Sequence, residues 1–425
     1  MKSSTVTIHP IAHPLSASVS VPGSKSLTNR ALLVAALAEG STRITDVSPA
    51  DDVHLLAEAL RTLGFEIEQD DTHRTVTVSG HGGRIPSKRG SLFVGNAGTA
   101  ARFLTAFVTL GRGEWVLDGD SRMRERPIGD LVDALTQLGA TLEATRGCPP
   151  VRIAASGLDG GVARMSGSVS SQFVSAVLMV APYARRPVEL ELTSALGSRP
   201  YVDMTVAVMG TFGIDLHRRG YESFAVTPSR YCSPSTYAIE PDVSAASYFF
   251  AAPAICGGDV LVRHIPHRSL QGDVAFLDLL RDMGCGVSYE HDGVRVTGAS
   301  ALRGIDANMG DIPDTAQTLA AVAPFAATPT RIRGIATARV KETDRISGTC
   351  TELRRLGVRV EEHTDGMTVH PCERFTPATV RTYGDHRMAM AFALIGLRVS
   401  GVTIDDPSCV SKTFPDFFDV LGTLR

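Results

Sequence analysis

The chain has few of the features that mark metal-binding, disulfide-stabilised or membrane proteins. Its seven cysteines form no CxxC pair and its 12 histidines no HExxH motif, so we predict no metal site and no disulfide framework. It also contains no run of about 18 apolar residues, and no basic segment followed by an apolar one at the N-terminus. These absences predict a cytoplasmic protein with reduced thiols and no membrane partner.

Basic and aromatic residues are also too sparse for a nucleic-acid-binding surface. The formal net charge is −3, the isoelectric point is near 6.5, and aromatic residues make up 6% of the chain. Binding to RNA or another polyanion would need a basic face with aromatic side chains for stacking. A GxxxxGK(S/T) motif is missing as well, so the sequence does not indicate a nucleotide triphosphate. We expect no nucleic-acid partner.

What the chain does contain is one pattern repeated six times. A short polar motif that opens an apolar helix begins at residues 22, 95, 167, 241, 311 and 383. About half a repeat later, five segments predict a helix that ends at a Leu-Gly, Met-Gly or Phe-Gly pair and precedes a strand. A sixth copy, FFDVLGTLR, would take its strand from the N-terminal segment VTIHPI. This period predicts a βαβαββ unit that is used six times.

The helices in the first half of each repeat predict an α+β class with an anion site. Their bodies are apolar on all sides, whereas the strands alternate polar and apolar residues, so we expect buried helices under sheets. Ser, Asn, Asp or Thr opens each helix and can cap its free N–H groups. Six such N-termini that faced one cavity would attract an anion. The alternative is a set of ordinary capped core helices.

Breaks in the pattern divide the chain into two domains. Pro22-Gly23 and Glu240-Pro241 both precede the first helix of a repeat, where Pro and Gly mark breaks. We predict a discontinuous domain of residues 1–22 plus 241–425 and an inserted domain of residues 23–240, each with three repeats. The natural ligand site of such a pair is the cleft between the two domains.

The first repeat places a cation and a hydroxyl at a helix start. Lys25 lies at that start, and Ser26 and Arg30 are four residues apart on one helix face, where both can reach one phosphate. The alternative is a solvated, capped helix. In a later basic run, Arg126 is a better candidate for an inward clamp than its neighbours Arg122 and Arg124, which we expect to be solvated.

The fifth repeat brings carboxylates and cations together. In the segment Arg339–Arg345, Glu342 lies beside Lys341, and an acid held by cations can donate or accept a proton. The alternative is a helix that carries i,i+4 ion pairs. Asp314 is either the cap of the fifth apolar helix or a general base at the mouth of a cationic cleft.

Nine motifs taken together resemble the family of 5-enolpyruvylshikimate-3-phosphate synthases, which are enolpyruvyl transferases. They occur in the family's order between Val21 and Phe418: PGSKSxxNRALLxAALA, GNAGTAxR, RxxERPIGxLVDAL, GSVSSQF, SxPYVDMT, DIPDxA, RVKETDR, DHRMAMAFAL and KTFPDFF. A single motif is weakly specific, but nine in order are specific. The resemblance implies a two-domain inverse α/β barrel with three βαβαββ units in each domain.

The resemblance also implies a reaction. The enolpyruvyl group of phosphoenolpyruvate would be transferred to the 5-hydroxyl of shikimate 3-phosphate, with release of phosphate and without a metal or cofactor. This is a step of chorismate and aromatic amino-acid biosynthesis, and glyphosate acts on the family at the phosphoenolpyruvate site. We expect a monomer whose partners are these two small substrates.

By the same resemblance, Asp314 would accept the 5-hydroxyl proton, Glu342 would be the acid or base at the methylene carbon, and Lys25 would be the third catalytic residue. Shikimate 3-phosphate would contact Lys25, Ser26, Arg30, Ser170, Ser171, Gln172, Ser198, Tyr201, Asp314 and Lys341. Phosphoenolpyruvate would contact Lys25, Asn96, Gly98, Arg126, Gln172, Arg345, Arg387 and Lys412. Two positions depart from the family pattern: Thr337, where bacterial relatives often carry Asn, and Phe103, where Pro or Leu is common.

Two other functions are alternatives to this one. A UDP-N-acetylglucosamine enolpyruvyl transferase would carry a KNA-type opening and a reactive cysteine in the loop of residues 119–127, which contains none. A non-catalytic clamp for a polyanion would need the basic, aromatic surface whose absence is described above.

Overall fold

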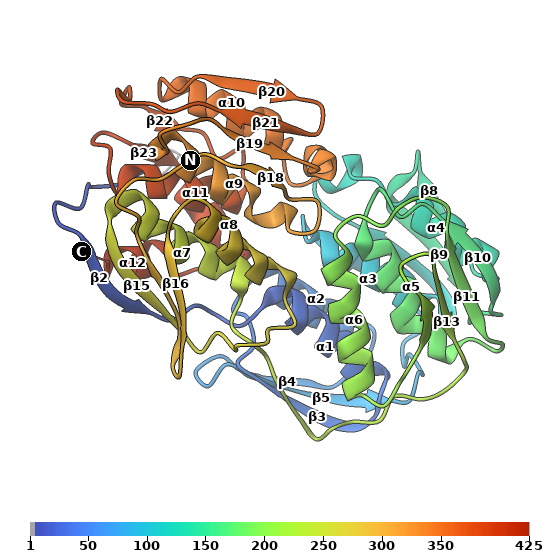
Figure 1. Cartoon of the computed structure of the whole chain (residues 1–425). Coiled ribbons are helices and arrows are strands. Elements are labelled where there is room, and N and C mark those ends of the chain that lie inside the picture. The colour runs from blue at the N-terminus through green and yellow to red at the C-terminus, as the bar shows by residue number, and fades with distance from the viewer. Residues whose placement is uncertain (1–4, 425) are drawn as a thin grey trace. The chain divides into compact units, whose positions relative to one another are not determined.

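The computed structural model describes residues 5–424, and the chain divides into two compact units. Unit 1 comprises Met1–Pro22 and Glu240–Arg425, and unit 2 comprises Gly23–Ile239. Each unit has its own apolar core. In Figure 1, unit 2 runs from blue to green, and unit 1 combines the blue N-terminal segment with the yellow to red part of the chain.

The helices of unit 2 are α1 (Lys25–Leu37), α2 (Asp51–Thr62), α3 (Gly98–Val108), α4 (Gly129–Gln137), α5 (Ser171–Val180) and α6 (Arg199–Thr211), with 3-10 helices η1 (Met123–Glu125) and η2 (Ala181–Tyr183). Its strands are β3 (Glu39–Thr45), β4 (Ile67–Asp70), β5 (Thr75–His81), β6 (Arg89–Phe93), β7 (Gly113–Asp118), β8 (Thr141–Thr145), β9 (Cys148–Ala155), β10 (Gly161–Met165), β11 (Val188–Leu192), β12 (His217–Arg219), β13 (Ser223–Val226) and β14 (Thr236–Ala238).

The helices of unit 1 are α7 (Val243–Cys256), α8 (Phe276–Asp282), α9 (Ala316–Val322), α10 (Arg345–Arg355), α11 (His386–Gly396) and α12 (Phe417–Gly422), with η3 (Gly272–Ala275), η4 (Pro313–Thr315), η5 (Ala323–Phe325), η6 (Ala336–Val340) and η7 (Pro407–Lys412). Its strands are β1 (Thr5–Thr7), β2 (Leu15–Val19), β15 (Gly258–Arg263), β16 (Gly286–Glu290), β17 (Gly293–Thr297), β18 (Asp306–Asn308), β19 (Thr330–Arg333), β20 (Val360–His363), β21 (Gly366–Val369), β22 (Thr379–Val380) and β23 (Thr403–Asp405).

The sheets show the repeat directly. Five four-stranded sheets share one pattern, in which a parallel pair is followed by two antiparallel neighbours: β14-β3-β5-β4, β6-β7-β9-β8, β10-β11-β13-β12, β2-β15-β17-β16 and β18-β19-β21-β20. In the sixth sheet, β22 pairs parallel with β23, and the N-terminal β1 pairs antiparallel with β23. The predicted α+β fold of six repeats is confirmed, including the strand that the N-terminus lends to the last repeat.

Six helices form the interior of the two units. The bodies of α1, α3 and α5 in unit 2, and of α7, α9 and α11 in unit 1, are almost entirely buried, as their all-round apolar sequences predict. Burying one Leu or Val side chain contributes roughly 1.5–3 kcal/mol. Sheets lie on the outside of each unit (Figure 1).

The second helix of each of the first five repeats ends for a stereochemical reason. The glycine that follows it has a left-handed φ of 84–108° at Gly64, Gly139, Gly213, Gly284 and Gly357. A side chain in this conformation costs roughly 1 kcal/mol, so glycine is favoured where the chain must turn from helix to strand. The Leu-Gly, Met-Gly and Phe-Gly pairs of the sequence are these helix ends.

Among residues 5–424, no helix is both long and apolar enough to cross a membrane. In the same range, no group of three or more His, Cys, Asp or Glu side chains is placed to hold a metal ion. The seven cysteines are free thiols, and burial raises the pKa of Cys256 to about 11 and that of Cys350 to about 12. Both of these thiols are therefore protonated at neutral pH.

Candidate functional site

In unit 2, the first cluster of predicted site residues forms at the start of α1. Ser24 caps this helix, because its hydroxyl accepts a hydrogen bond from the Leu27 N–H. The Lys25 ammonium lies 2.8 Å from Asp52 Oδ2, and the two side chains are only 12% and 2% exposed. The alternative prediction, that the start of α1 is solvated, is therefore wrong. Sequence reasoning missed Asp52, which lies on α2 and is remote from Lys25 in the chain.

Arg30 lies one turn further along α1 and is 1% exposed. Its guanidinium donates to Thr205 Oγ1 at 2.7 Å, to the Ser26 carbonyl at 2.8 Å, and to the Tyr201 carbonyl at 2.9 Å. A longer bond of 3.4 Å reaches Ser175 Oγ. Burial lowers the pKa of Arg30 to about 10, so the group is still charged at neutral pH.

The start of α3 carries the second cluster of unit 2. Arg126 is 4% exposed, and its Nη1 donates to Asn96 Oδ1 at 2.8 Å and to the Asn96 carbonyl at 3.1 Å. A Cβ added at Gly98, the first residue of α3, would lie 2.9 Å from the Arg126 guanidinium carbon. Arg102 Nη2 donates to the Pro127 carbonyl at 2.7 Å and so fixes the residue after Arg126.

The neighbours of Arg126 behave differently from it. Arg122 pairs with Glu125, and Arg124 pairs with Asp118; the two arginine side chains are 31% and 57% exposed. Arg126 is thus more deeply buried than either neighbour, as predicted, and Arg124 is exposed, whereas Arg122 is only partly exposed.

The remaining predicted residues of unit 2 lie at the starts of α5 and α6. Ser170 caps α5, since its hydroxyl accepts from the Gln172 N–H, and Gln172 Nε2 donates to Thr99 Oγ1 of α3 at 3.2 Å. Ser171 is the first residue of α5. Ser198 is the N-terminal flanking residue of α6 and has a left-handed φ of 54°. Unit 2 therefore brings its predicted residues to the N-termini of α1, α3, α5 and α6.

In unit 1, one arginine binds both predicted site acids, Asp314 and Glu342. Arg345 is 3% exposed. It donates from Nε to Asp385 Oδ2 at 2.7 Å, from Nη1 to Asp314 Oδ1 at 3.1 Å, and from Nη2 to Glu342 Oε2 at 2.9 Å. Asp385 also caps α11, where its carboxylate accepts from the Arg387 N–H. The sequence motif contains Asp385, but nothing in it identifies this residue as the partner of Arg345.

The other cations of unit 1 surround the same two carboxylates. Arg387 Nη2 donates to Asp314 Oδ2 at 2.7 Å, and Lys412 Nζ lies 4.0 Å from Glu342 Oε1. Lys341 is half-buried and contributes to the field at Asp314. Asp314 is therefore held by two guanidiniums, and Glu342 lies between Arg345 and Lys412.

These contacts shift the pKa values of the cluster in opposite directions. Burial alone would raise the pKa of Asp314, but Arg387, Arg345 and Lys341 lower it well below the ordinary aspartate value. Burial would likewise lower the pKa of Arg345, whereas Asp385, Glu342 and Asp314 raise it above the usual arginine value. Asp314 is a carboxylate and Arg345 a cation across the physiological pH range.

Three local predictions are corrected by the structure. Asp314 does not cap the fifth apolar helix, because α9 begins at Ala316 without a side-chain cap and the Asp314 carboxylate accepts from the two arginines instead. Residues 341–344 are not helical, since η6 ends at Val340 and α10 begins at Arg345. Side-chain caps are present on α1, α5, α7 and α11 but not on α3, which follows Ala97.

Asp273, on η3, is a further acid of this cluster that sequence reasoning missed. It is 4% exposed, and the Ser244 hydroxyl of α7 donates to its carboxylate. Burial, followed by the negative charge of Asp314, raises the pKa of Asp273 to about 7, against the opposing effects of the Ser244 hydrogen bond and of Arg387. No motif identified this residue, because its surroundings come from segments that are distant in the chain.

Asp273→Asn should change how the free energy of unfolding depends on pH. The pKa of this carboxyl group is higher in the folded chain than in the unfolded chain, where it is about 4. Such a group contributes fully to the stability of the fold at a pH below its unfolded pKa. That contribution is lost as the pH rises through the folded pKa. We therefore expect the stability of the wild type relative to the variant to fall by about 2 kcal/mol between pH 5 and pH 8. Urea denaturation at both pH values measures this difference.

The control for this measurement is Asp306→Asn, which removes a largely exposed partner of Arg333. It should leave the pH dependence of stability unchanged. An Asp273→Asn variant whose stability followed pH as the wild type does would contradict the raised pKa.

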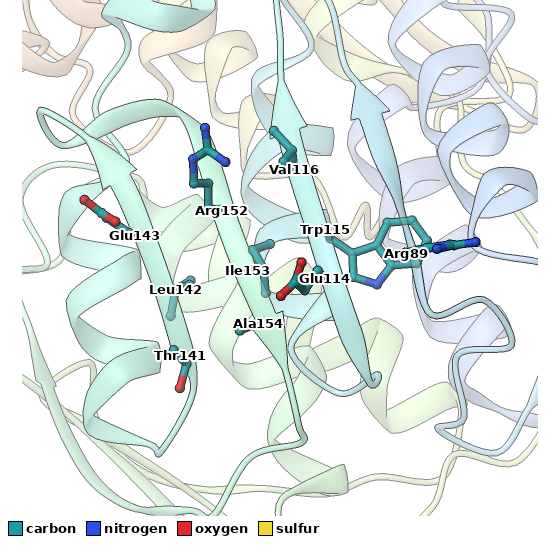
Figure 2. Close-up of a pocket in the computed structure, with 10 residues that line it drawn as sticks. All are labelled: Arg89, Glu114, Trp115, Val116, Thr141, Leu142, Glu143, Arg152, Ile153 and Ala154. Carbon is teal, nitrogen blue, oxygen red and sulfur yellow. The ribbon is translucent and has the colours of Figure 1, made fainter.

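A pocket of about 490 Å³ lies elsewhere, on the sheet β6-β7-β9-β8 (Figure 2). None of the predicted site residues lines it. Its lining residues, which Figure 2 labels, are Arg89, Glu114, Trp115, Val116, Thr141, Leu142, Glu143, Arg152, Ile153 and Ala154.

The chain is similar along nearly its whole length to known proteins. A family model described as EPSP synthase (3-phosphoshikimate 1-carboxyvinyltransferase) matches residues 10–421. A 3-phosphoshikimate 1-carboxyvinyltransferase of a Nostoc species is 47% identical over 416 residues, covering 97% of this chain and 98% of that protein. A chloroplastic enzyme of the same name from Brassica napus is 47% identical over 442 residues and covers 100% of this chain and 86% of its own length. The solved structure of an EPSP synthase from Acinetobacter baumannii has a TM-score of 0.82 and 25% identity, with 98% and 97% of the two chains covered.

Proposed function

The chain belongs to the EPSP synthase family, and from this premise we propose how its residues bind the two substrates and move the protons of the reaction. It is an enzyme that transfers the enolpyruvyl group of phosphoenolpyruvate to the 5-hydroxyl of shikimate 3-phosphate and releases phosphate. The 5-hydroxyl adds to the substituted carbon of the double bond while the methylene carbon gains a proton. Loss of phosphate and of a methyl proton then gives the enol ether.

The observation that carries the assignment of roles is that Arg345 binds both Asp314 and Glu342. One guanidinium thus holds two carboxyl groups at a fixed spacing, which suits a reaction that removes a proton at one atom and adds one at another. In this proposal, Asp314 accepts the 5-hydroxyl proton and Glu342 exchanges a proton with the methylene carbon. Arg345, Arg387 and Lys412 bind the anionic groups of phosphoenolpyruvate.

Unit 2 supplies the remaining contacts in this proposal. Shikimate 3-phosphate binds to Lys25, Ser26, Arg30, Ser170, Ser171, Gln172, Ser198 and Tyr201, together with Asp314 and Lys341 of unit 1. Phosphoenolpyruvate binds to Lys25, Asn96, Gly98, Arg126 and Gln172. The location of these residues at four helix N-termini supports the proposal, because such termini attract phosphate and carboxylate groups.

A phosphate-release assay tests the function. The purified chain should release phosphate only when both shikimate 3-phosphate and phosphoenolpyruvate are present, and without added metal. Release with UDP-N-acetylglucosamine in place of shikimate 3-phosphate would support the rival transferase instead. If neither acceptor led to release of phosphate, both transferase activities would be contradicted and a non-catalytic binding protein would be favoured.

Because the residues assigned to phosphoenolpyruvate belong to both units, we expect the ligands to draw the two units together. Small-angle X-ray scattering should show a smaller radius of gyration with shikimate 3-phosphate plus glyphosate than with either compound alone. Scattering curves that did not change on addition of both compounds would contradict a site shared by the two units.

We further propose that the enzyme works as a monomer in the cytoplasm. The free state of its seven cysteines supports a reducing compartment. Sedimentation equilibrium measures the oligomeric state directly.

A further inference from the structure

Phe103 is the residue that the sequence singled out and the proposed function leaves without a role. It lies on α3, and its ring is fully buried. The Arg30 guanidinium carbon lies 5.3 Å from the centre of this ring. A cation within about 6 Å of an aromatic face is attracted by the ring, and the attraction is stronger where water is excluded.

The hydrogen bonds of Arg30 show why this contact matters. Within residues 5–424, all of its partners are neutral oxygens: the hydroxyls of Thr205 and Ser175 and the carbonyls of Ser26 and Tyr201. No carboxylate in that range forms an ion pair with it, in contrast to Lys25 and Arg345. The buried charge of Arg30 is thus stabilised by dipoles and by the aromatic face of Phe103.

The same bonds leave part of the guanidinium available. An arginine side chain has five N–H donors. Arg30 donates four hydrogen bonds, one from Nε, one from Nη1 and two from Nη2. Within residues 5–424, one N–H of Nη1 forms no hydrogen bond, and this is the donor that we assign to a ligand. The direction of this donor depends on the plane of the guanidinium, and the ring of Phe103 contacts that group from the neighbouring helix.

We propose that Phe103 is a positioning residue for substrate recognition, which orients the free N–H of Arg30 toward an oxygen of shikimate 3-phosphate. The inference rests on the proposed role of Arg30 and extends it to a residue that does not itself touch the substrate. Its effect is on binding of shikimate 3-phosphate, because Arg30 is assigned to that substrate and not to phosphoenolpyruvate.

Phe103→Leu tests the proposal, with Phe107→Leu as the matched control. Both residues are fully buried on α3, but Phe107 packs edge-on against Phe65, and no arginine in residues 5–424 lies over its ring. Titration calorimetry should show that shikimate 3-phosphate binds about tenfold more weakly to Phe103→Leu than to the wild type, and within about twofold of the wild type to Phe107→Leu. At saturating shikimate 3-phosphate, kcat and the KM for phosphoenolpyruvate should change less than about threefold.

A second pair of variants separates positioning from stability. Phe103→Tyr retains the aromatic face but buries a hydroxyl, so it should lower Tm and still bind shikimate 3-phosphate within about threefold of the wild type. Phe103→Met fills a similar volume without a ring and repeats the test if the leucine variant does not fold. Equal affinity of all variants, or a change in the KM for phosphoenolpyruvate alone, would overturn the proposal. A wild type that does not bind shikimate 3-phosphate would instead contradict the proposed function.

Discussion

Asp314→Ala should lower kcat by roughly 10²–10⁴-fold, while the dissociation constant for shikimate 3-phosphate changes by less than about tenfold. The carboxylate is ionised at neutral pH, because Arg387 and Arg345 hold it at 2.7 and 3.1 Å. Both arginines remain in the variant and can still bind anions, so the loss should fall on proton removal more than on binding. Steady-state kinetics and calorimetry with shikimate 3-phosphate separate the two quantities.

A matched control is Asp259→Asn, which removes a carboxylate of β15 from its ion pair with Arg295 of β17. It should leave kcat and both KM values within about twofold of the wild type, as expected of a partly exposed pair. Near-full turnover by Asp314→Ala would show that this residue only holds the two arginines. A loss of shikimate 3-phosphate binding that matched the loss of turnover would show that it acts in binding.

Gly98→Ala should raise the KM for phosphoenolpyruvate by roughly 10- to 100-fold and weaken glyphosate further still. A Cβ at this position would meet a ligand that approaches the backbone closely. The structure adds a second reason, since this Cβ would lie 2.9 Å from the Arg126 guanidinium carbon. Arg126 is held by two hydrogen bonds to Asn96, so moving it displaces a group that we assign to phosphoenolpyruvate.

The wild type should be inhibited by glyphosate in competition with phosphoenolpyruvate. The control is Gly210→Ala, which adds a methyl group to α6 at a position where no atom outside the adjoining helix backbone lies within 4 Å. It should change neither constant. If Gly98→Ala raised the KM for shikimate 3-phosphate instead, or if phosphoenolpyruvate did not relieve inhibition of the wild type, the assignment of Gly98 would be wrong.

The architecture follows largely from local patterns in the sequence. Apolar helices such as α7, in which all residues are buried, are recognised because a segment without a polar face has no stable place at the surface. The glycines after α2 and α4 are recognised because a left-handed residue ends each helix. The apolar helix recurs six times and the glycine helix end five times. This repetition predicts the fold class and the strand that the N-terminus lends to the last repeat.

The predicted site residues were recognised differently, through the likeness of nine motifs to a known family. Local reasoning alone left alternatives open for several of them. By local preference alone, Asp314 is also a candidate helix cap, and residues 341–344 are also candidates for a helix. Neither alternative holds in the structure, because cap and helix preferences are weak compared with the attraction between buried charges. The two arginines that bind Asp314 decide the first of these questions, and they come from other segments of unit 1.

The amino-acid sequence alone therefore predicts the six-fold repeat, the buried helices and the residues that belong to the family's motifs. It does not predict which groups are partners, because these pairs form only when distant segments pack together: Asp52 with Lys25, Asp385 with Arg345, Ser244 with Asp273, and the ring of Phe103 with Arg30. The two kinds of feature differ in how far apart along the chain the interacting residues lie. Periodicity and turn conformation depend on neighbours within a few residues, whereas the charge, hydrogen bonding and pKa of a buried group depend on whichever distant segments pack around it.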